Sequence, residues 1–154
     1  METTEVRIVR LEPLRVASAL AYGLSPEREA FAKLLPWARA KGLWGGAVRP
    51  RLFGFNNPDP APGSPNYGYE VWLEVGPEVR SDGEIRVKEF VGGLYAVSRC
   101  VSLDDIFNCW QRLVAWAEAS PHRPIRRQCL EEHVEYDEAP GGRVVIDLYL
   151  PIWG

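Results

Sequence analysis

Two strand-like stretches of this 154-residue chain each carry an acid and, two residues later, an aromatic ring. The first is YEVWLEV, with Glu70 and Trp72, and the second is IDLYLPI, with Asp147 and Tyr149. Because side chains alternate between the two faces of a strand, each acid shares a face with its aromatic neighbour. A carboxylate beside aromatic rings can hold an organic cation by charge and by cation–π attraction, the latter about 0.5–2 kcal/mol for a good ring. We therefore interpret these faces as open, ligand-facing surfaces; the alternative is an ordinary exposed face without a function.

The same carboxylates also suit acid–base catalysis. A carboxyl group against apolar walls has a raised pKa and can protonate a leaving oxygen or activate water. If the site is catalytic, we expect Glu70 to be protonated near neutral pH, with Gly68 leaving space for a substrate on its face. The sequence shows no nucleophile constellation, metal-ligand spacing or phosphate-binding loop, so we predict no metal site and no cofactor.

Composition narrows the class of protein. A net charge of −3 argues against direct nucleic-acid binding, which needs a basic surface. No stretch approaches the roughly 18 apolar residues of a membrane span, and the first residues lack the apolar core of a secretion signal. The three cysteines form no CxxC pair, and an odd count without a secretion signal is typical of reduced thiols in the cytoplasm. We therefore expect a cytoplasmic protein with no membrane association.

The hydrophobic pattern predicts an α+β fold built from two similar halves. Strands are expected at 6–11, 14–22, 49–55, 67–75, 85–90, 94–100, 128–136 and 143–152, and helices at 26–41 and 103–119. We expect consecutive strands to form hairpins, including 6–22 and 85–100. The order is β-β-α-β-β twice, which predicts a single domain over 1–154 with pseudo-repeats at about 6–75 and 84–152. An antiparallel sheet with two helices on one face can leave its other face open.

Four motifs in this order, FGFNNPDP, YGYEVWLEV, KEFVGGLYAV and IDLYLPI, resemble the GyrI-like small-molecule-binding domain. This is the effector-binding domain of AraC-type and MerR-type multidrug regulators and of gyrase-inhibitor proteins. The resemblance spans 6–152 and implies a curved antiparallel sheet with two helices behind it and a ligand groove in front. It also implies that lipophilic, often cationic aromatic compounds bind there, on aromatic walls around a buried acid.

Carried to this chain, the resemblance places acids at Glu70, at Glu131 in the CLEEH stretch, and at Asp147, where a Glu is common in the family. The expected ligand-binding residues are Glu70, Glu131 and Asp147 with the rings of Phe55, Trp72, Tyr95 and Tyr149.

The resemblance leaves two functions open. The first is multidrug or effector binding by a stand-alone domain, acting with a partner regulator or as a homodimer. We see no winged-helix or helix-turn-helix segment, so we expect no direct DNA binding. The alternative is a hydrolase that opens cyclopropanoid DNA-alkylating compounds, as some stand-alone members do. In that case Glu70 and Glu131 are the expected catalytic acid and base, with Asp147 as another candidate for the second role.

Overall fold

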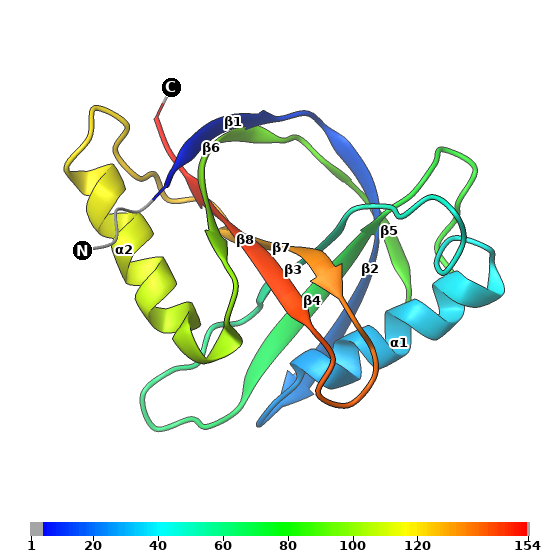
Figure 1. The fold of residues 1–154 in the computed structure, drawn as a ribbon. Coiled ribbons are helices and arrows are strands. Elements are labelled where there is room, and N and C mark those ends of the chain that lie inside the picture. The colour runs from blue at the N-terminus through cyan, green and yellow to red at the C-terminus, as the bar shows by residue number, and fades with distance from the viewer. Residues whose placement is uncertain (1–4, 154) are drawn as a thin grey trace. The chain divides into compact units, whose positions relative to one another are not determined.

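The computed structural model describes residues 5–153 and confirms the α+β fold class. Its elements follow the predicted β-β-α-β-β order twice, with a short 3₁₀ turn, η1, before the second helix (Figure 1). They are β1 (Arg7–Leu11), β2 (Leu14–Gly23), α1 (Glu27–Ala40), β3 (Leu52–Asn56), β4 (Tyr67–Glu74), β5 (Arg86–Phe90), β6 (Gly93–Cys100), η1 (Leu103–Asp105), α2 (Ile106–Glu118), β7 (Leu130–Tyr136) and β8 (Val144–Pro151).

The chain divides into two compact units that do not coincide with the predicted repeats. One unit comprises 14–90, and the other comprises 91–154 together with 1–13; we call them the 14–90 unit and the 91–154 unit. Each contains four antiparallel strands, in the orders β5-β2-β4-β3 and β1-β6-β8-β7, and one helix. Each unit therefore includes one edge strand from the other predicted repeat. β5 lies in the 14–90 unit, and β1 lies in the 91–154 unit.

The two expected hairpins at 6–22 and 85–100 are wrong. β1 pairs with β6, and β2 pairs with β5. The two-residue link after β1 contains Pro13, which has no N–H to donate to a ladder. The link after β5 ends at Gly92, which has a φ of +77° and lies so close to β1 that a Cβ would be 2.1 Å from the Leu11 carbonyl oxygen. Only glycine fits that backbone conformation and that approach.

In the 14–90 unit, α1 packs on β2 and β4. Its buried stripe comprises Ala30, Phe31, Leu34, Leu35 and Ala38. On β4 the helix meets the face that carries Tyr69, whose ring centroid lies 6.3 Å from that of Phe31. A glycine at position 54 makes room for this ring, because a Cβ there would be 2.3 Å from the Tyr69 hydroxyl. Residues 70 and 72 consequently point to the face away from α1.

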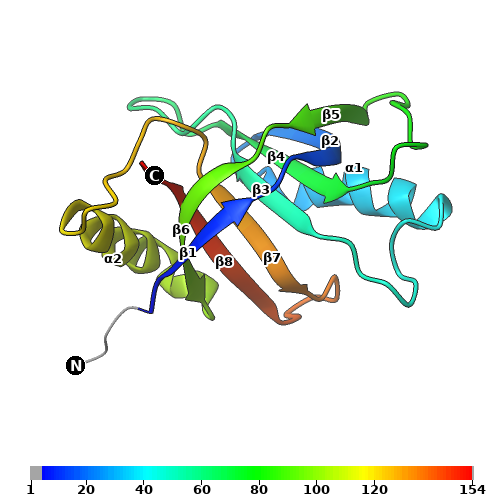
Figure 2. The same cartoon turned by 90° about the horizontal axis from the view of Figure 1, so that it is seen from above.

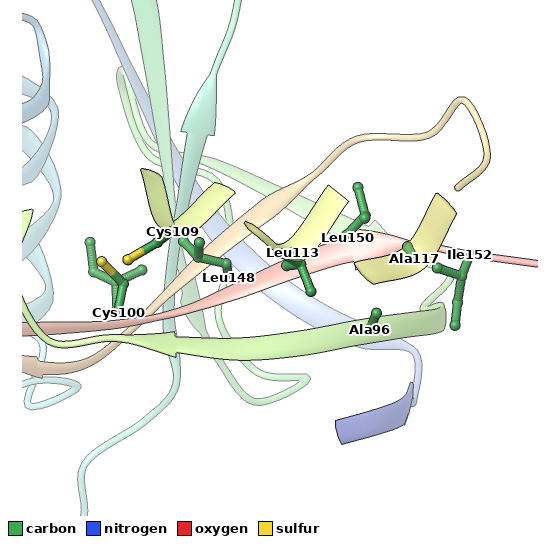
Figure 3. Packing of buried hydrophobic residues seen from close by; sticks show 9 residues of the cluster. Ala96, Cys100, Cys109, Leu113, Ala117, Leu148, Leu150 and Ile152 are labelled. Atoms are coloured by element: carbon green, nitrogen blue, oxygen red, sulfur yellow. The ribbon is translucent and has the colours of Figure 1, made fainter. Parts of the chain in front are cut away.

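In the 91–154 unit, α2 packs on β6 and β8 (Figure 2). Figure 3 shows the core between them, in which Cys109, Leu113 and Ala117 of the helix meet Ala96 of β6 and alternate residues of β8, including Leu148. The alternate residues 147 and 149 therefore lie on the face of β8 away from α2. Both acid–aromatic pairs thus avoid the helix-covered face of their own unit, as strand alternation predicted.

Candidate functional site

The first acid is the centre of a dense polar cluster in the 14–90 unit. Glu70 lies on β4, between Leu20 of β2 and Phe55 of β3. Its side chain is only 3% exposed. Four donors reach its carboxylate: Ser18, Asn57, Trp72 and Lys88. We call these five residues the Glu70 cluster.

The donors divide unequally between the two carboxylate oxygens. Oε2 accepts hydrogen bonds from Ser18 Oγ at 2.7 Å, Trp72 Nε1 at 2.6 Å and Lys88 Nζ at 2.6 Å. Oε1 accepts one from Asn57 Nδ2 at 2.9 Å. The side chains of Ser18 and Trp72 are buried, whereas Asn57 and Lys88 are exposed residues. The carboxylate is therefore held from the inside by two neutral donors and from the outside by one amide and one ammonium group.

These donors decide the charge of Glu70. Burial raises its pKa, but the hydrogen bonds from Lys88, Trp72, Ser18 and Asn57 act in the opposite direction and leave the pKa below its usual value. The carboxyl group is therefore ionised at neutral pH. The expectation that Glu70 is protonated near neutral pH, as a catalytic acid would require, is wrong for this structure.

Two aromatic rings pack against Trp72 of the Glu70 cluster. The Trp72 ring meets Phe55 edge-on, with centroids 4.9 Å apart, and lies 5.1 Å from Phe90 in a tilted arrangement. Trp72 is 7% exposed, so it is a buried ring and not the open position that the sequence suggested. Phe90 and Lys88 were not predicted as site residues, although alternation along β5 puts both on one face of that strand.

Contrary to the prediction, Gly68 does not leave space for a substrate. A Cβ at this position would be 1.7 Å from the carbonyl oxygen of Asn57 and 3.0 Å from the Pro58 ring. The space beside Gly68 is thus filled by the loop after β3 and is not left for a substrate. This close approach, with the backbone hydrogen bond from Asn57 N to Gly68 O at 2.8 Å, places Asn57 beside Glu70.

The second acid, Asp147, is held by two arginines in the 91–154 unit. Its Oδ2 accepts from Arg7 Nη2 at 2.9 Å, and its Oδ1 accepts from Arg99 Nε at 2.8 Å. The hydrogen bond with Asp147 raises the pKa of Arg99. Asp147 itself is buried, whereas both arginine side chains are more than half exposed.

Two tyrosine rings of this unit also lie close together. Tyr149 lies 5.7 Å from Tyr95, centroid to centroid, and its hydroxyl donates to Glu132 Oε1 at 2.6 Å. Burial raises the pKa of Tyr95. Glu132 pairs with Asp147 across the strands, so these side chains share one face.

Glu131 does not join this group. It pairs with Leu148, on the face that α2 covers, and its Oε2 accepts from Trp110 Nε1 at 3.2 Å. The acid beside Tyr149 is therefore Glu132, and the placement expected for Glu131 is wrong by one residue. Because side chains alternate along a strand, Glu131 and Glu132 point to opposite faces of the sheet. The register with β8 determines which of the two lies on the face of Tyr149.

Apart from Glu131, the predicted site residues fall into two sets, one within each unit. Glu70, Trp72 and Phe55 come together in the 14–90 unit, and Asp147, Tyr149 and Tyr95 in the 91–154 unit. Across residues 5–153, no three His, Cys, Asp or Glu side chains are grouped so as to hold a metal ion. No helix within this range is long and apolar enough to cross a membrane.

The sequence over residues 4–152 matches the GyrI-like small molecule binding domain. This chain belongs to that family. A comparison with curated proteins gives no match.

Similar solved structures agree on the fold. They include the EcmrR C-terminal domain, at 11% identity and a TM-score of 0.71, with 99% of each chain covered. A hydrolase from Listeria innocua shares 12% identity, with a TM-score of 0.71, and the match covers 99% of this chain and 94% of that one. A protein bound to tetraphenylphosphonium shares 10% identity, with a TM-score of 0.55 and coverage of 97% and 94%. At these identities the likeness extends to the fold alone.

Proposed function

We propose that this GyrI-like domain binds lipophilic aromatic cations at the Glu70 cluster and the rings around it. The observation that carries the proposal is a buried, ionised carboxylate hydrogen-bonded to Trp72, whose ring packs against those of Phe55 and Phe90. A buried carboxylate attracts a cation more strongly than an exposed one, because the surrounding medium screens its charge less. The rings add dispersion and cation–π attraction.

The family and one neighbour support this choice of ligand. The GyrI-like family is defined by small-molecule binding, and a protein of similar fold binds tetraphenylphosphonium, a lipophilic cation with four aromatic rings. A multidrug role, a cytoplasmic location, and a partner regulator or homodimer remain predictions from the sequence.

Hydrolysis is the second candidate, and it is supported by the neighbour from Listeria innocua. In this chain the proton donor assigned to such a reaction, Glu70, is ionised, and its carboxylate already accepts four hydrogen bonds. An ionised carboxylate can activate water but cannot protonate a leaving oxygen. Cation binding therefore needs only the ionised carboxylate that this site has, whereas the proposed hydrolysis also needs a proton donor that Glu70 does not supply.

The test is a comparison of charged and neutral ligands. Tetraphenylphosphonium and the neutral compound triphenylphosphine oxide are titrated against tryptophan fluorescence, with wild type, Glu70→Gln and a matched control, Glu74→Gln. Glu74 lies on the same strand and face and is half-buried, but it accepts a hydrogen bond from the Arg51 backbone instead.

We expect wild type and Glu74→Gln to prefer the cation, and Glu70→Gln to lose about tenfold in affinity for it, or about 1.4 kcal/mol. Equal affinity of wild type for both compounds would show that the charge of the carboxylate does not contribute to binding. In parallel, product formation from an electrophilic cyclopropane compound is measured, and turnover by wild type would favour the hydrolase.

A further inference from the structure

We propose that Lys88 determines the charge specificity of the Glu70 cluster, because its ammonium group occupies the position that a ligand's positive charge must take. This inference rests on the proposed function and deepens it. A cationic ligand can pair with Glu70 only when Lys88 leaves, so Lys88 acts as a resident competitor for cations.

The first support is the charge count of the cluster. Glu70 has four donors, and Lys88 is the one that carries a charge. With Lys88 in place the cluster is neutral, and Oε2 already accepts three hydrogen bonds. Without it, the carboxylate keeps three neutral donors and a full negative charge. The electrostatic attraction that the proposed function requires is therefore available only after Lys88 has moved.

The second support is the position of Lys88. Its side chain is 45% exposed, whereas that of Glu70 is 3% exposed, although Nζ and Oε2 are 2.6 Å apart. Lys88 lies in the middle of β5, the edge strand of this unit, where its backbone pairs with Val16. A lysine has a flexible four-carbon stem and a strongly hydrated ammonium group. Its side chain can turn into solvent while the strand stays paired, and this rotation exposes the carboxylate.

The third support is that the buried donors can hold Glu70 during the exchange. The bonds from Ser18 and Trp72 come from buried side chains on β2 and β4, in the interior of this four-stranded order. They hold the carboxylate oxygen at the position that Lys88 vacates. The apparent affinity for a cation is then its intrinsic affinity multiplied by the fraction of molecules in which Lys88 is displaced.

The experiment uses two ions of the same shape and opposite charge, tetraphenylphosphonium and tetraphenylborate. Affinities of both are measured by calorimetry for wild type, Lys88→Met and Arg86→Met. Arg86 is the matched control, because it is an exposed cation on the same strand, two residues away, while the four hydrogen bonds to Glu70 come from other residues.

We expect Lys88→Met to bind tetraphenylphosphonium about tenfold more tightly than wild type, which corresponds to about 1.4 kcal/mol. We expect it to bind tetraphenylborate more weakly, because the anion loses its cationic partner. In Arg86→Met both affinities should change little, since an exposed charge is screened by salt. The double variant Glu70→Gln/Lys88→Met should not show the tenfold gain for the cation.

Several results would overturn the inference. If wild type binds tetraphenylphosphonium and Lys88→Met binds it no more tightly, Lys88 does not compete, although the proposed function stands. If Lys88→Met gains affinity for both ions equally, Lys88 blocks by size and not by charge. If neither wild type nor Lys88→Met binds the cation, the proposed function itself fails.

A folding defect would not leave the question open. Removing Lys88 leaves a buried charge without its partner, so Lys88→Met could lose stability. Lys88→Gln then takes its place, because it removes the charge but keeps a neutral N–H donor on a side chain one bond shorter. The same gain for the cation and loss for the anion are expected from it, and their absence would equally overturn the inference.

Discussion

The substitution Glu70→Gln tests whether this carboxyl group is ionised in the folded protein. Glutamine has the same shape as a protonated glutamic acid. If Glu70 were protonated, the substitution would be nearly neutral or stabilising. The structure instead predicts a loss, because three of its donors converge on Oε2 and an amide nitrogen cannot accept from any of them.

The size of the loss follows from the partners. Turning the amide oxygen toward Ser18, Trp72 and Lys88 keeps those bonds but replaces their charged acceptor with a neutral one. Hydrogen bonds to a charged group contribute about 1.5–3 kcal/mol, and neutral ones about 0.5–1.5 kcal/mol, so the two buried donors lose about 2 kcal/mol together. The half-exposed Lys88 pair adds at most about 1 kcal/mol. Glutamine regains part of this, since no charge is buried.

We therefore expect Glu70→Gln to lower the free energy of unfolding by about 1–3 kcal/mol at pH 7. At about 2–4 °C per kcal/mol for a chain of this size, the melting temperature should fall by about 2–12 °C. Circular dichroism melts and urea unfolding measure both quantities, and Glu74→Gln is the control, with a small change expected. A Glu70→Gln variant as stable as wild type at pH 7 would refute the reasoning.

The pH dependence gives a second check on the same variant. The pKa of Glu70 is lower in the folded protein than the ordinary value of 4.5 for a glutamate side chain. Its ionisation therefore adds stability that is fully present above about pH 4.5 and is lost as the pH falls through the folded-state pKa. The difference between wild type and Glu70→Gln should be constant from pH 8 to pH 5 and should shrink at lower pH. A difference that grows on acidification would contradict an ionised Glu70.

Two further predictions concern the cores of the units. Trp72→Ala should lower the free energy of unfolding by about 3–5 kcal/mol, because the ring is 7% exposed; a loss below 1 kcal/mol in urea unfolding would contradict this burial. Burial, followed by the neighbouring Cys100, raises the pKa of Cys109, so its thiol stays protonated at pH 8. In native protein a disulfide reagent should modify the half-buried Cys129 promptly and Cys109 only after unfolding. Prompt labelling of Cys109 would show that the helix face of its unit opens readily.

Strand alternation predicted which side chains share a face, but it did not predict which strands are neighbours. The pairs Glu70 with Trp72 and Asp147 with Tyr149 each lie within one strand, so the sequence alone fixes their common face. Lys88 and Phe90 reach the same cluster from β5, which pairs with β2. This pairing arises because the chain passes from one unit to the other at the short links after β1 and after β5. That crossing depends on tertiary packing, and the sequence offers only Pro13 and Gly92 as local signs of it.

The charge of Glu70 could not be predicted from the sequence either. Apolar neighbours in YGYEVWLEV favour a raised pKa, and burial does act in that direction. The four hydrogen bonds that outweigh burial come from residues 18, 57, 72 and 88, which lie on four separate segments of the chain. Only residue 72 is close to Glu70 in sequence. A pKa set by converging donors can be read only once the fold has brought them together.

The two acid–aromatic pairs have different electrostatic surroundings, and this difference bears on where a cation would bind. Asp147 is buried between Arg7 and Arg99, so displacing one guanidinium group leaves the other in place. Glu70 has one charged partner, and its other donors are neutral. A cation that replaces Lys88 therefore meets a full negative charge, whereas a cation that replaces Arg7 meets a carboxylate that Arg99 still neutralises. For this reason we assign cation selectivity to the 14–90 unit.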